Sequence, residues 1–348
     1  MTLYTPSVRT FVFCAALAAF VQIGSSQEAG AQTATEAATR QYAVAVGFQN
    51  QKLYKPAIAE WKTFVRKFPT DPRLDRAQHY LGTCSLQAKD YPAAVVAFQT
   101  VLQKYPKFDL LDQTALNLGI SHYAIAQVSK KPADYGKAEK AFAVVISKFP
   151  KSDYAPRALF YSGECQYQQD NLTAAAKSYA ALIRSFPEDD MSADALYALA
   201  VTQEALKQPN EALSTLATFG NKYPKHRLRT EVQMRQAEIL FAKDSFQQAL
   251  TLFSQVAAVT EYRLSDVAML RQARCLYELE QYEKAGEVYW DVPRKFEQTK
   301  HYDTAVLAGG KCFFLNGQYE VARTGLEIVA NRDVPEAAEA KMWIGRSF

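Results

Sequence analysis

Residues 82–106, GTCSLQAKDYPAAVVAFQTVLQKYP, indicate the fold, because their arrangement recurs along most of the chain. Gly82, Ala94, Phe98 and Pro106 stand at offsets 0, 12, 16 and 24. Residues 163–187, GECQYQQDNLTAAAKSYAALIRSFP, repeat this order of small residue, alanine, aromatic residue and proline. Apolar residues follow Ala94 at three- and four-residue steps, the period of a helix with one buried face. Proline ends such a helix, so the stretch predicts two helices joined by a turn.

The motif recurs with a period of about 37 residues. A marker residue, usually aromatic and three residues before an alanine, lies at Tyr54, Tyr91, Tyr135, Leu172, Pro209, Phe246, Tyr282 and Tyr319. The successive spacings of this marker are 37, 44, 37, 37, 37, 36 and 37 residues. One unit alone cannot bury its apolar face, so neighbouring units must stack into a continuous solenoid.

The unit resembles the tetratricopeptide repeat, in which two antiparallel helices carry a small residue, an alanine, an aromatic residue and a proline at these offsets. This resemblance implies an all-α fold, a right-handed α-α superhelix (TPR solenoid) of about eight helix-turn-helix repeats, over residues 32–348. Glu261 and Glu297 replace the proline in two units, which leaves those helix ends open. Residues 341–348 align with the first helix of a ninth unit. We therefore expect the array to continue beyond Phe348.

The first 31 residues have the layout of a secretory signal peptide, with cleavage expected after Ala31. Arg9 precedes an apolar stretch, residues 11–23, and small residues follow. The stretch is shorter than the ~20 residues that span a bilayer, so we expect no transmembrane anchor. Cys14 lacks the small residues expected before a lipid-carrying cysteine. The mature protein is predicted to be exported and periplasmic, without a lipid anchor.

Composition and motifs give no support for catalysis. Forty basic and 36 acidic residues leave a net charge of +4, without the basic run typical of nucleic-acid binding. Gly-rich phosphate loops, His-Glu-x-x-His runs and Gly-x-Ser-x-Gly elbows are missing from the sequence. The histidines, which we expect to be surface or packing residues without metal partners, are His79, His122, His226 and His301. We predict no enzyme activity, cofactor or metal.

The cysteines follow the repeat. Four of them, Cys84, Cys165, Cys275 and Cys312, occupy one position in different units, seven residues before the marker. This row shares a helical face with a row of alanines seven residues earlier. Packed helices lie ~8–10 Å apart, beyond the ~7 Å that a disulfide spans between Cα atoms. We therefore expect free, buried thiols that act as small apolar side chains.

Two rows on the first helices suggest a binding groove. The row three residues before the small residue reads His79, Leu116, Phe160, Tyr197, Met234, Leu270 and Leu307. The row seven residues later reads Leu86, Tyr123, Tyr167, Glu204, Phe241, Tyr277 and Phe314. First helices line the concave surface of tetratricopeptide arrays, so the resemblance implies an apolar groove. Its candidate residues are Phe160, Tyr167, Tyr197, Met234, Phe241, Tyr277 and Phe314. The alternative is that both rows only widen the core between repeats.

The 44-residue spacing reflects seven extra residues at 127–133, between the two helices of the third unit. This insertion contains Lys130 and Lys131. It is either a longer solvated helix and loop or a basic protrusion that contacts a partner.

These features predict a non-catalytic periplasmic scaffold that binds proteins or peptide segments and not nucleic acid. The repeat also resembles the periplasmic tetratricopeptide proteins of the Tol-Pal system and of outer-membrane β-barrel assembly. The first family usually carries an N-terminal coiled coil, for which residues 32–39 are too short, and the second is lipidated. An alternative is that the array belongs to a larger enzyme or peptidoglycan-binding protein whose working domain follows Phe348. The oligomeric state stays open.

Overall fold

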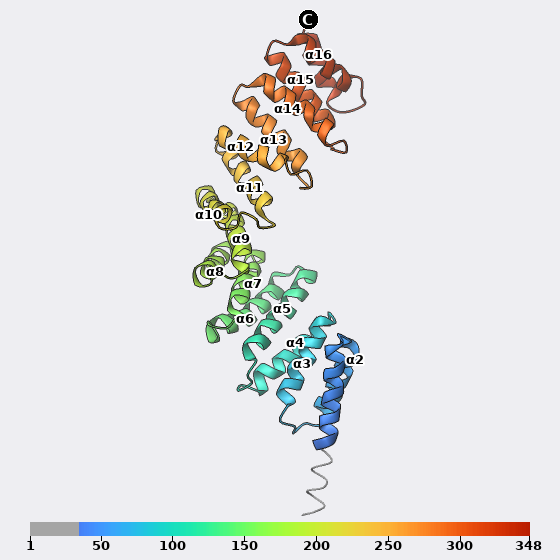
Figure 1. Ribbon diagram of the computed structural model, residues 1–348, viewed down its shortest axis with the longest axis vertical. Helices are drawn as coiled ribbons and strands as arrows, with labels where there is room; N and C mark the ends of the chain where they lie inside the picture. Colours follow the sequence, from blue (N-terminus) through green and yellow to red (C-terminus); the bar gives the residue numbers. More distant parts are fainter. Residues whose placement is uncertain (1–34) are drawn as a thin grey trace, which may run out of the picture. The chain divides into compact units, whose positions relative to one another are not determined.

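The computed structural model describes residues 35–348, in which every regular element is a helix (Figure 1). The helices form two compact units that divide within α8, after Ser178. The first unit contains a helix over residues 35–50, α2 (Tyr54–Lys67), α3 (Leu74–Gln87), α4 (Tyr91–Lys104), α5 (Leu111–Ser129), α6 (Pro132–Lys148) and α7 (Ala155–Gln168). The division crosses α8 (Leu172–Ser185). The second unit contains α9 (Met191–Ala205), α10 (Pro209–Lys222), α11 (Arg229–Ala242), α12 (Phe246–Ala257), α13 (Ser265–Glu278), α14 (Tyr282–Lys295), α15 (Tyr302–Leu315), α16 (Tyr319–Ala330) and α17 (Ala337–Arg346).

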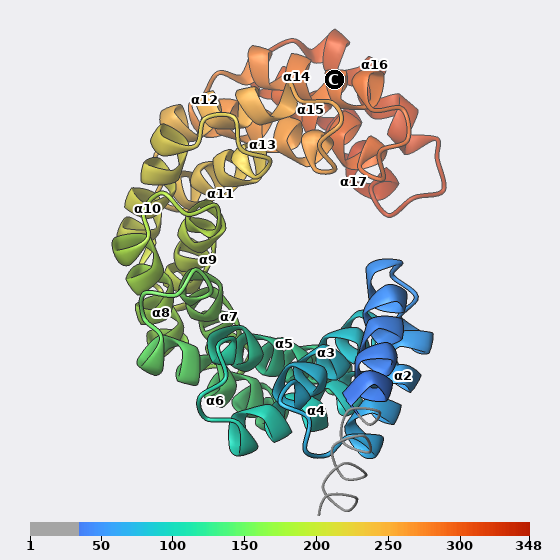
Figure 2. The same ribbon diagram turned by 60° about the horizontal axis from the view of Figure 1, so that its bottom comes forward.

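Each unit has two layers of helices. In the first unit α3, α5 and α7 lie on the inner side of a curve and α4 and α6 on the outer side (Figure 2). In the second unit α9, α11, α13 and α15 are the inner helices, and α10, α12, α14 and α16 are the outer ones. Helices that follow one another in the chain pack together, from α2 to α7 and from α9 to α17. This confirms the predicted all-α helical-repeat fold.

The outer helices end where the aromatic-Pro pairs predict. In α4, the residue after the last helical residue is Tyr105, whose N–H still donates to the carbonyl of Val101. Pro106 then cannot donate to the helix. Of the two ends that lack the proline, α14 stops at the same point, with Phe296 as its cap, whereas α12 ends two residues earlier, at Ala257. An aromatic cap is therefore sufficient in α14, whereas in the shorter α12 the equivalent position is Thr260 and lies beyond the end of the helix.

A left-handed residue ends the inner helix at each turn into an outer helix. The N–H of Asp90, just after Lys89, donates to the carbonyl of Ser85, which satisfies the end of α3. Only one of these residues is the glycine that usually takes this conformation. With φ between 56° and 78°, the residues are Lys52, Lys89, Lys130, Asp170, Lys207, Asp244, Glu280 and Gly317.

The small residues of the repeat make room for rings of the outer helices. A Cβ atom added to Gly82 would lie 2.6 Å from the Phe98 ring, and one added to Gly119 would lie 2.4 Å from the Phe142 ring. Both rings are fully buried. The alanine row of the outer helices is 0% exposed throughout: Ala57, Ala94, Ala138, Ala175, Ala212, Ala249, Ala285 and Ala322. The close packing that the repeat predicts is confirmed.

The four cysteines of the repeat row are buried and free, as predicted. Burial raises the pKa of the Cys84 thiol to about 11 and of the Cys165, Cys275 and Cys312 thiols to about 12. The thiols therefore stay protonated at neutral pH and serve as core side chains.

Candidate partner-binding surface

The two rows of the predicted groove differ in depth. In the first row, Met234 is 6% exposed and packs in the core with Ala237 and Phe253, while Phe160 and Tyr197 are half-buried. In the second row, every side chain from Leu86 to Phe314 is half-buried. Met234 therefore belongs to the core, and the second row forms the more accessible line on the inner helices.

Rings of the second row lean on the helix that follows. The centroids of Phe241 and Phe246 are 5.3 Å apart, and those of Tyr277 and Tyr282 are 5.4 Å apart, both edge to face. Phe314 packs in the same way on Tyr319. Such pairs contribute about 0.5–1.5 kcal/mol beyond burial. These rings thus stabilise the turn of their own repeat while keeping part of their surface open.

Arginines lie over the rings of three aromatic residues of the two rows, Tyr197, Phe241 and Tyr277. The Arg235 guanidinium lies 5.3 Å from the Tyr197 centroid, and that of Arg271 lies 5.5 Å from the Phe241 centroid. Both arginines hold the same position in their repeats, two residues before the small residue. Arg235 also pairs with Glu204 of the preceding repeat, at 3.2 Å. The inner surface of the second unit is therefore aromatic and charged at once.

A polar network surrounds Tyr197. Arg235 donates to the Tyr197 hydroxyl at 2.8 Å, and the hydroxyls of Tyr197 and Tyr262 donate to Glu231 at 3.3 and 2.7 Å. Burial raises the pKa of Tyr197, and burial together with Glu231 raises the pKa of Tyr262. Both phenols therefore remain donors at neutral pH. The network borders a hollow of about 640 Å³ that Arg227 also lines.

The sequence alone did not identify Glu231, Arg235 and Tyr262 as members of this surface. A signal was present for Arg235, because it shares its register position with Arg271. Tyr262 lies in the irregular connection after α12, where the repeat pattern does not predict which side chains meet. Only the fold brings its hydroxyl to Glu231.

The extra residues of the third unit lengthen both helices around one turn. α5 runs to Ser129 and α6 starts at Pro132. Lys130 and Lys131 lie exposed at the tip, beside Val128, which is 82% exposed. The Ser129 hydroxyl donates to Asp134 at 2.7 Å, which fixes the tip. The insertion is thus an extended helical hairpin, and a partner for it stays a prediction.

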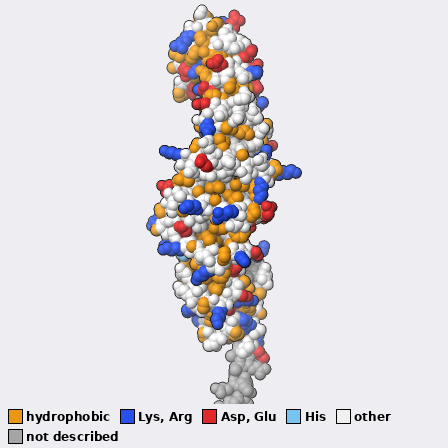
Figure 3. Space-filling view, turned by 90° about the vertical axis from the view of Figure 1, so that its left-hand side faces the viewer, with side chains coloured by type: hydrophobic (Ala, Val, Ile, Leu, Met, Phe, Trp, Pro, Cys, Tyr) orange, Lys and Arg blue, Asp and Glu red, His pale blue; other side chains and the backbone are white. Residues whose placement is uncertain are grey.

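His79 is a packing residue, 2% exposed, with Nδ1 2.8 Å from the Thr114 hydroxyl. Burial lowers the pKa of His79 to about 4, so it is neutral at pH 7. On the face drawn in Figure 3, basic and acidic side chains are scattered among apolar and uncharged atoms. Within residues 35–348, no helix has the length and apolar character needed to cross a membrane. The predicted signal peptide and Cys14 lie outside the described residues.

Comparisons with known proteins agree with this architecture. Residues 35–161 match the family described as outer membrane lipoprotein (YfiO). Residues 114–228 match a tetratricopeptide repeat-like domain, and residues 267–297 match the tetratricopeptide repeat itself. No curated protein matches the chain.

Solved structures share the fold at low identity. The C-terminal part of a TPR repeat-containing protein from Cytophaga hutchinsonii is 13% identical, covers 76% of this chain and 98% of its own, and has a TM-score of 0.56. The apo form of RapI is 13% identical, with 79% and 82% covered and a TM-score of 0.54. Together with the repeat register, the family matches at residues 35–161, 114–228 and 267–297 lead to one conclusion: the chain is a tetratricopeptide-repeat protein whose N-terminal part resembles the outer membrane lipoprotein family.

Proposed function

We propose that this protein is a non-catalytic scaffold of the cell envelope, which binds a peptide segment or helix of a partner protein along its inner helices. Tetratricopeptide and outer membrane lipoprotein domains are protein-interaction scaffolds in general. The finer statement, that binding uses the inner surface, rests on the second row of the groove. Catalysis has no motif in the sequence to support it.

One observation carries the proposal: from Leu86 to Phe314 the second row is only partly buried in each repeat, although it is largely apolar. A row required only for packing would be as deeply buried as the alanine row. Instead Phe241 and Tyr277 present part of their rings beside Arg271 and Arg274, whose side chains are 44% and 48% exposed. Aromatic residues and arginine are the types that most often dominate binding energy at interfaces.

The envelope location rests on two independent supports. Residues 1–31 have the layout of a signal peptide, and residues 35–161 match a family described by its outer membrane location. Cell fractionation followed by mass spectrometry of the N-terminus tests it. We expect the protein in the envelope fraction, starting at Gln32. A cytoplasmic protein that retains residue 1 would reject the location.

The binding surface is tested by site-specific photocrosslinking in cells. A benzoylphenylalanine at Arg274, on an inner helix, is expected to form a crosslink to a partner protein. The same probe at Val96 is the matched control, because Val96 is 65% exposed but lies on outer helix α4. Crosslinks from Val96 alone would place the interface on the outer helices instead.

Alanine variants then separate binding from packing. Tyr167→Ala and Phe241→Ala should each weaken capture of the crosslinked partner by about tenfold while the melting temperature stays within a few degrees of wild type. If the variants unfold at room temperature, or keep full binding while folded, these residues serve the core and the proposal that they bind a partner is wrong.

A further inference from the structure

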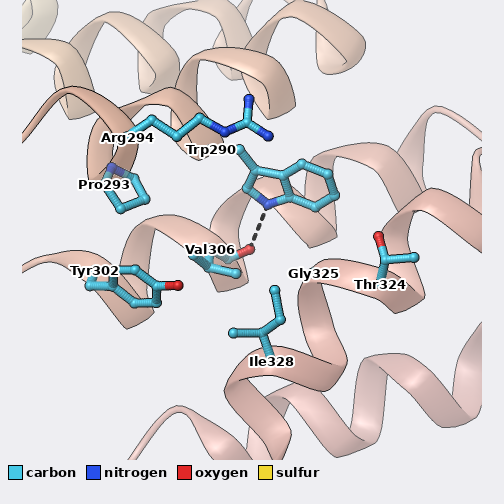
Figure 4. Close-up of a pocket in the computed structure, with 8 residues that line it drawn as sticks. All are labelled: Trp290, Pro293, Arg294, Tyr302, Val306, Thr324, Gly325 and Ile328. Atoms are coloured by element: carbon cyan, nitrogen blue, oxygen red, sulfur yellow. Dashed lines mark hydrogen bonds between the residues drawn. The ribbon is translucent and has the colours of Figure 1, made fainter. Parts of the chain in front are cut away.

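A second surface lies on the outer side of the second unit, away from the inner rows. Here a hollow of about 440 Å³ opens in the furrow between outer helices α14 and α16, and the first half of α15 forms its floor (Figure 4). It is lined by Trp290, Pro293, Arg294, Tyr302, Val306, Thr324, Gly325 and Ile328.

The furrow forms because the residues at three positions differ from those at the equivalent positions of the other repeats. The Trp290 ring lies so close to α15 and α16 that a Cβ atom on Gly309 or on Gly325 would come within 2.3 Å of it. The indole N–H donates to the carbonyl of Val306 at 3.0 Å, which fixes the ring. The three departures therefore fit one another: a large ring and the two glycines that admit it.

Other repeats have none of these three residues at the equivalent positions. Instead of Trp290 they carry Lys62, Gln99, Ala143, Ala180, Ala217, Ser254 and Glu327. Instead of Gly309 they carry Leu81, Leu118, Ser162, Leu199, Gln236 and Gln272. Instead of Gly325 they carry Glu60, Ala97, Ala141, Ser178, Thr215, Leu252 and Val288. A rigid aromatic wall beside an open hollow is thus a local construction of this repeat pair.

The adjoining face of α16 is unusually apolar. Val321 and Ile328 are 39% and 49% exposed, and Thr324 lies between them on the same helical stripe. The equivalent stripes on α12 and α14 are polar or charged: Gln248, Thr251 and Gln255, and Lys284, Glu287 and Asp291. Exposed apolar side chains that continue a hollow are typical of a docking surface.

One charged side chain lines the hollow. The Arg294 side chain is 70% exposed and pairs with Asp291 at 3.2 Å, an ion pair one helical turn apart whose carboxylate is itself 41% exposed. An ion pair open to water to this degree binds weakly. The guanidinium therefore remains available to a second carboxylate, and the remaining lining residues are uncharged.

We propose that this furrow docks a segment of a partner protein that places a Leu or Phe side chain against Trp290 and a carboxylate against Arg294. The volume accommodates a large side chain, and the apolar stripe of α16 extends the contact along the segment. The aromatic wall supplies buried area, while Arg294 selects for acidic neighbours. This surface is separate from the inner-helix groove, so either can fail without the other.

The test uses the full chain labelled with 5-fluorotryptophan and observed by ¹⁹F NMR. The protein has three tryptophans, and Trp290→Phe assigns the signal of interest. The probe is the peptide acetyl-Ser-Leu-Phe-Asp-Ser-amide, with an otherwise identical Asn peptide for comparison. We expect the Asp peptide to shift the Trp290 signal and to bind about five- to tenfold more tightly than the Asn peptide. Arg294→Gln should remove this difference.

Surface variants show whether the furrow itself is the site. Ile328→Glu places a carboxylate at an exposed position of the hollow and should abolish the shift while the protein stays folded. Val96→Glu is the matched control, since Val96 is an exposed apolar residue at the position of Thr324 in another repeat. It should leave the shift intact.

Four outcomes would overturn the proposal. They are a shift that survives Ile328→Glu, no shift of the Trp290 signal at millimolar peptide, a shift produced more readily by dodecanoate than by either peptide, and a shift that depends only on protein concentration. The third result would point to an acyl ligand, and the last to self-association of this chain.

Discussion

The glycines at the regular repeat position and the two glycines around Trp290 have different structural consequences. At Gly82 and Gly119 the missing side chain admits the ring of the following outer helix, which is fully buried. At Gly309 and Gly325 it admits Trp290 from the preceding outer helix, and this ring stays partly exposed beside a hollow. The first kind repeats with the motif and makes the fold. The second kind falls at positions without a pattern and makes a surface particular to one pair of repeats.

The largest expected effect is at a regular site. Phe142→Ala should cost about 3–5 kcal/mol of unfolding free energy, because a buried ring leaves a cavity against Gly119. Urea unfolding followed by circular dichroism measures it. Trp290→Ala is the comparison and should cost clearly less, since that ring is only half-buried. Equal losses would erase the distinction between the two kinds of site.

His79 makes the regular core sensitive to pH, since its ring lies 5.9 Å from that of Phe98. Its pKa is about 4 in the folded protein, below the 6.5 of a free histidine. The unfolded chain therefore takes up the proton first, and stability falls as pH drops from about 6.5 to 4. We expect a loss of about 3 kcal/mol over this range.

The control for this prediction is His79→Leu, which places the residue found at the equivalent Leu116. Asp109, which raises the pKa of His79, and Arg76, which lowers it, remain in both proteins. Stability measured by urea unfolding at each pH should fall less in the variant. Parallel pH curves would contradict a neutral buried histidine.

At the irregular site, Gly309→Ala should destabilise the protein by about 2 kcal/mol, because the new methyl overlaps the Trp290 ring. The double variant with Trp290→Ala removes the overlapping ring, so the glycine substitution should cost little in that background. The unfolding free energies of the wild type, the two single variants and the double variant form a double-mutant cycle. Additive losses would show that ring and glycine are independent.

The smallest effect concerns the left-handed turns. Glu280→Gly should stabilise the protein by up to about 1 kcal/mol, since glycine adopts φ near 58° without the steric cost of a side chain. Gly317→Ala, the reverse change at φ 78°, should destabilise it. A melting-temperature comparison suffices. If Glu280→Gly destabilises, side-chain contacts at that turn outweigh backbone strain.

The repeat register allowed most of the fold to be predicted. Spacing alone placed the helix pairs, the buried alanine and cysteine rows, and the end of α4 before Tyr105. It did not identify the left-handed turns, because Lys89 and Glu280 are not residues that mark such a conformation. Spacing also identifies the face of the helix on which a residue lies, but not how deeply its side chain is buried. Met234 and Tyr197 share a row, yet one is in the core and the other joins a polar network.

The candidate surfaces were only partly predictable for the same reason. The second row follows the register and was identified with its aromatic members. The Trp290 furrow arises where Gly309 and Gly325, 16 residues apart in sequence, meet one ring in space. Tyr262 reaches Glu231 from an irregular connection. Neither juxtaposition follows from a 37-residue period.

The α5–α6 hairpin shows how this architecture can grow. Its turn keeps the left-handed residue at Lys130 although both helices are longer, and the neighbouring helix pairs retain their regular length. Length added at a turn therefore projects outward without disturbing the stacking of repeats. For protein engineering, each turn that ends in a left-handed residue is a place to graft a helical extension. The left-handed residue keeps its place at the turn, and the helices on either side of it can lengthen together.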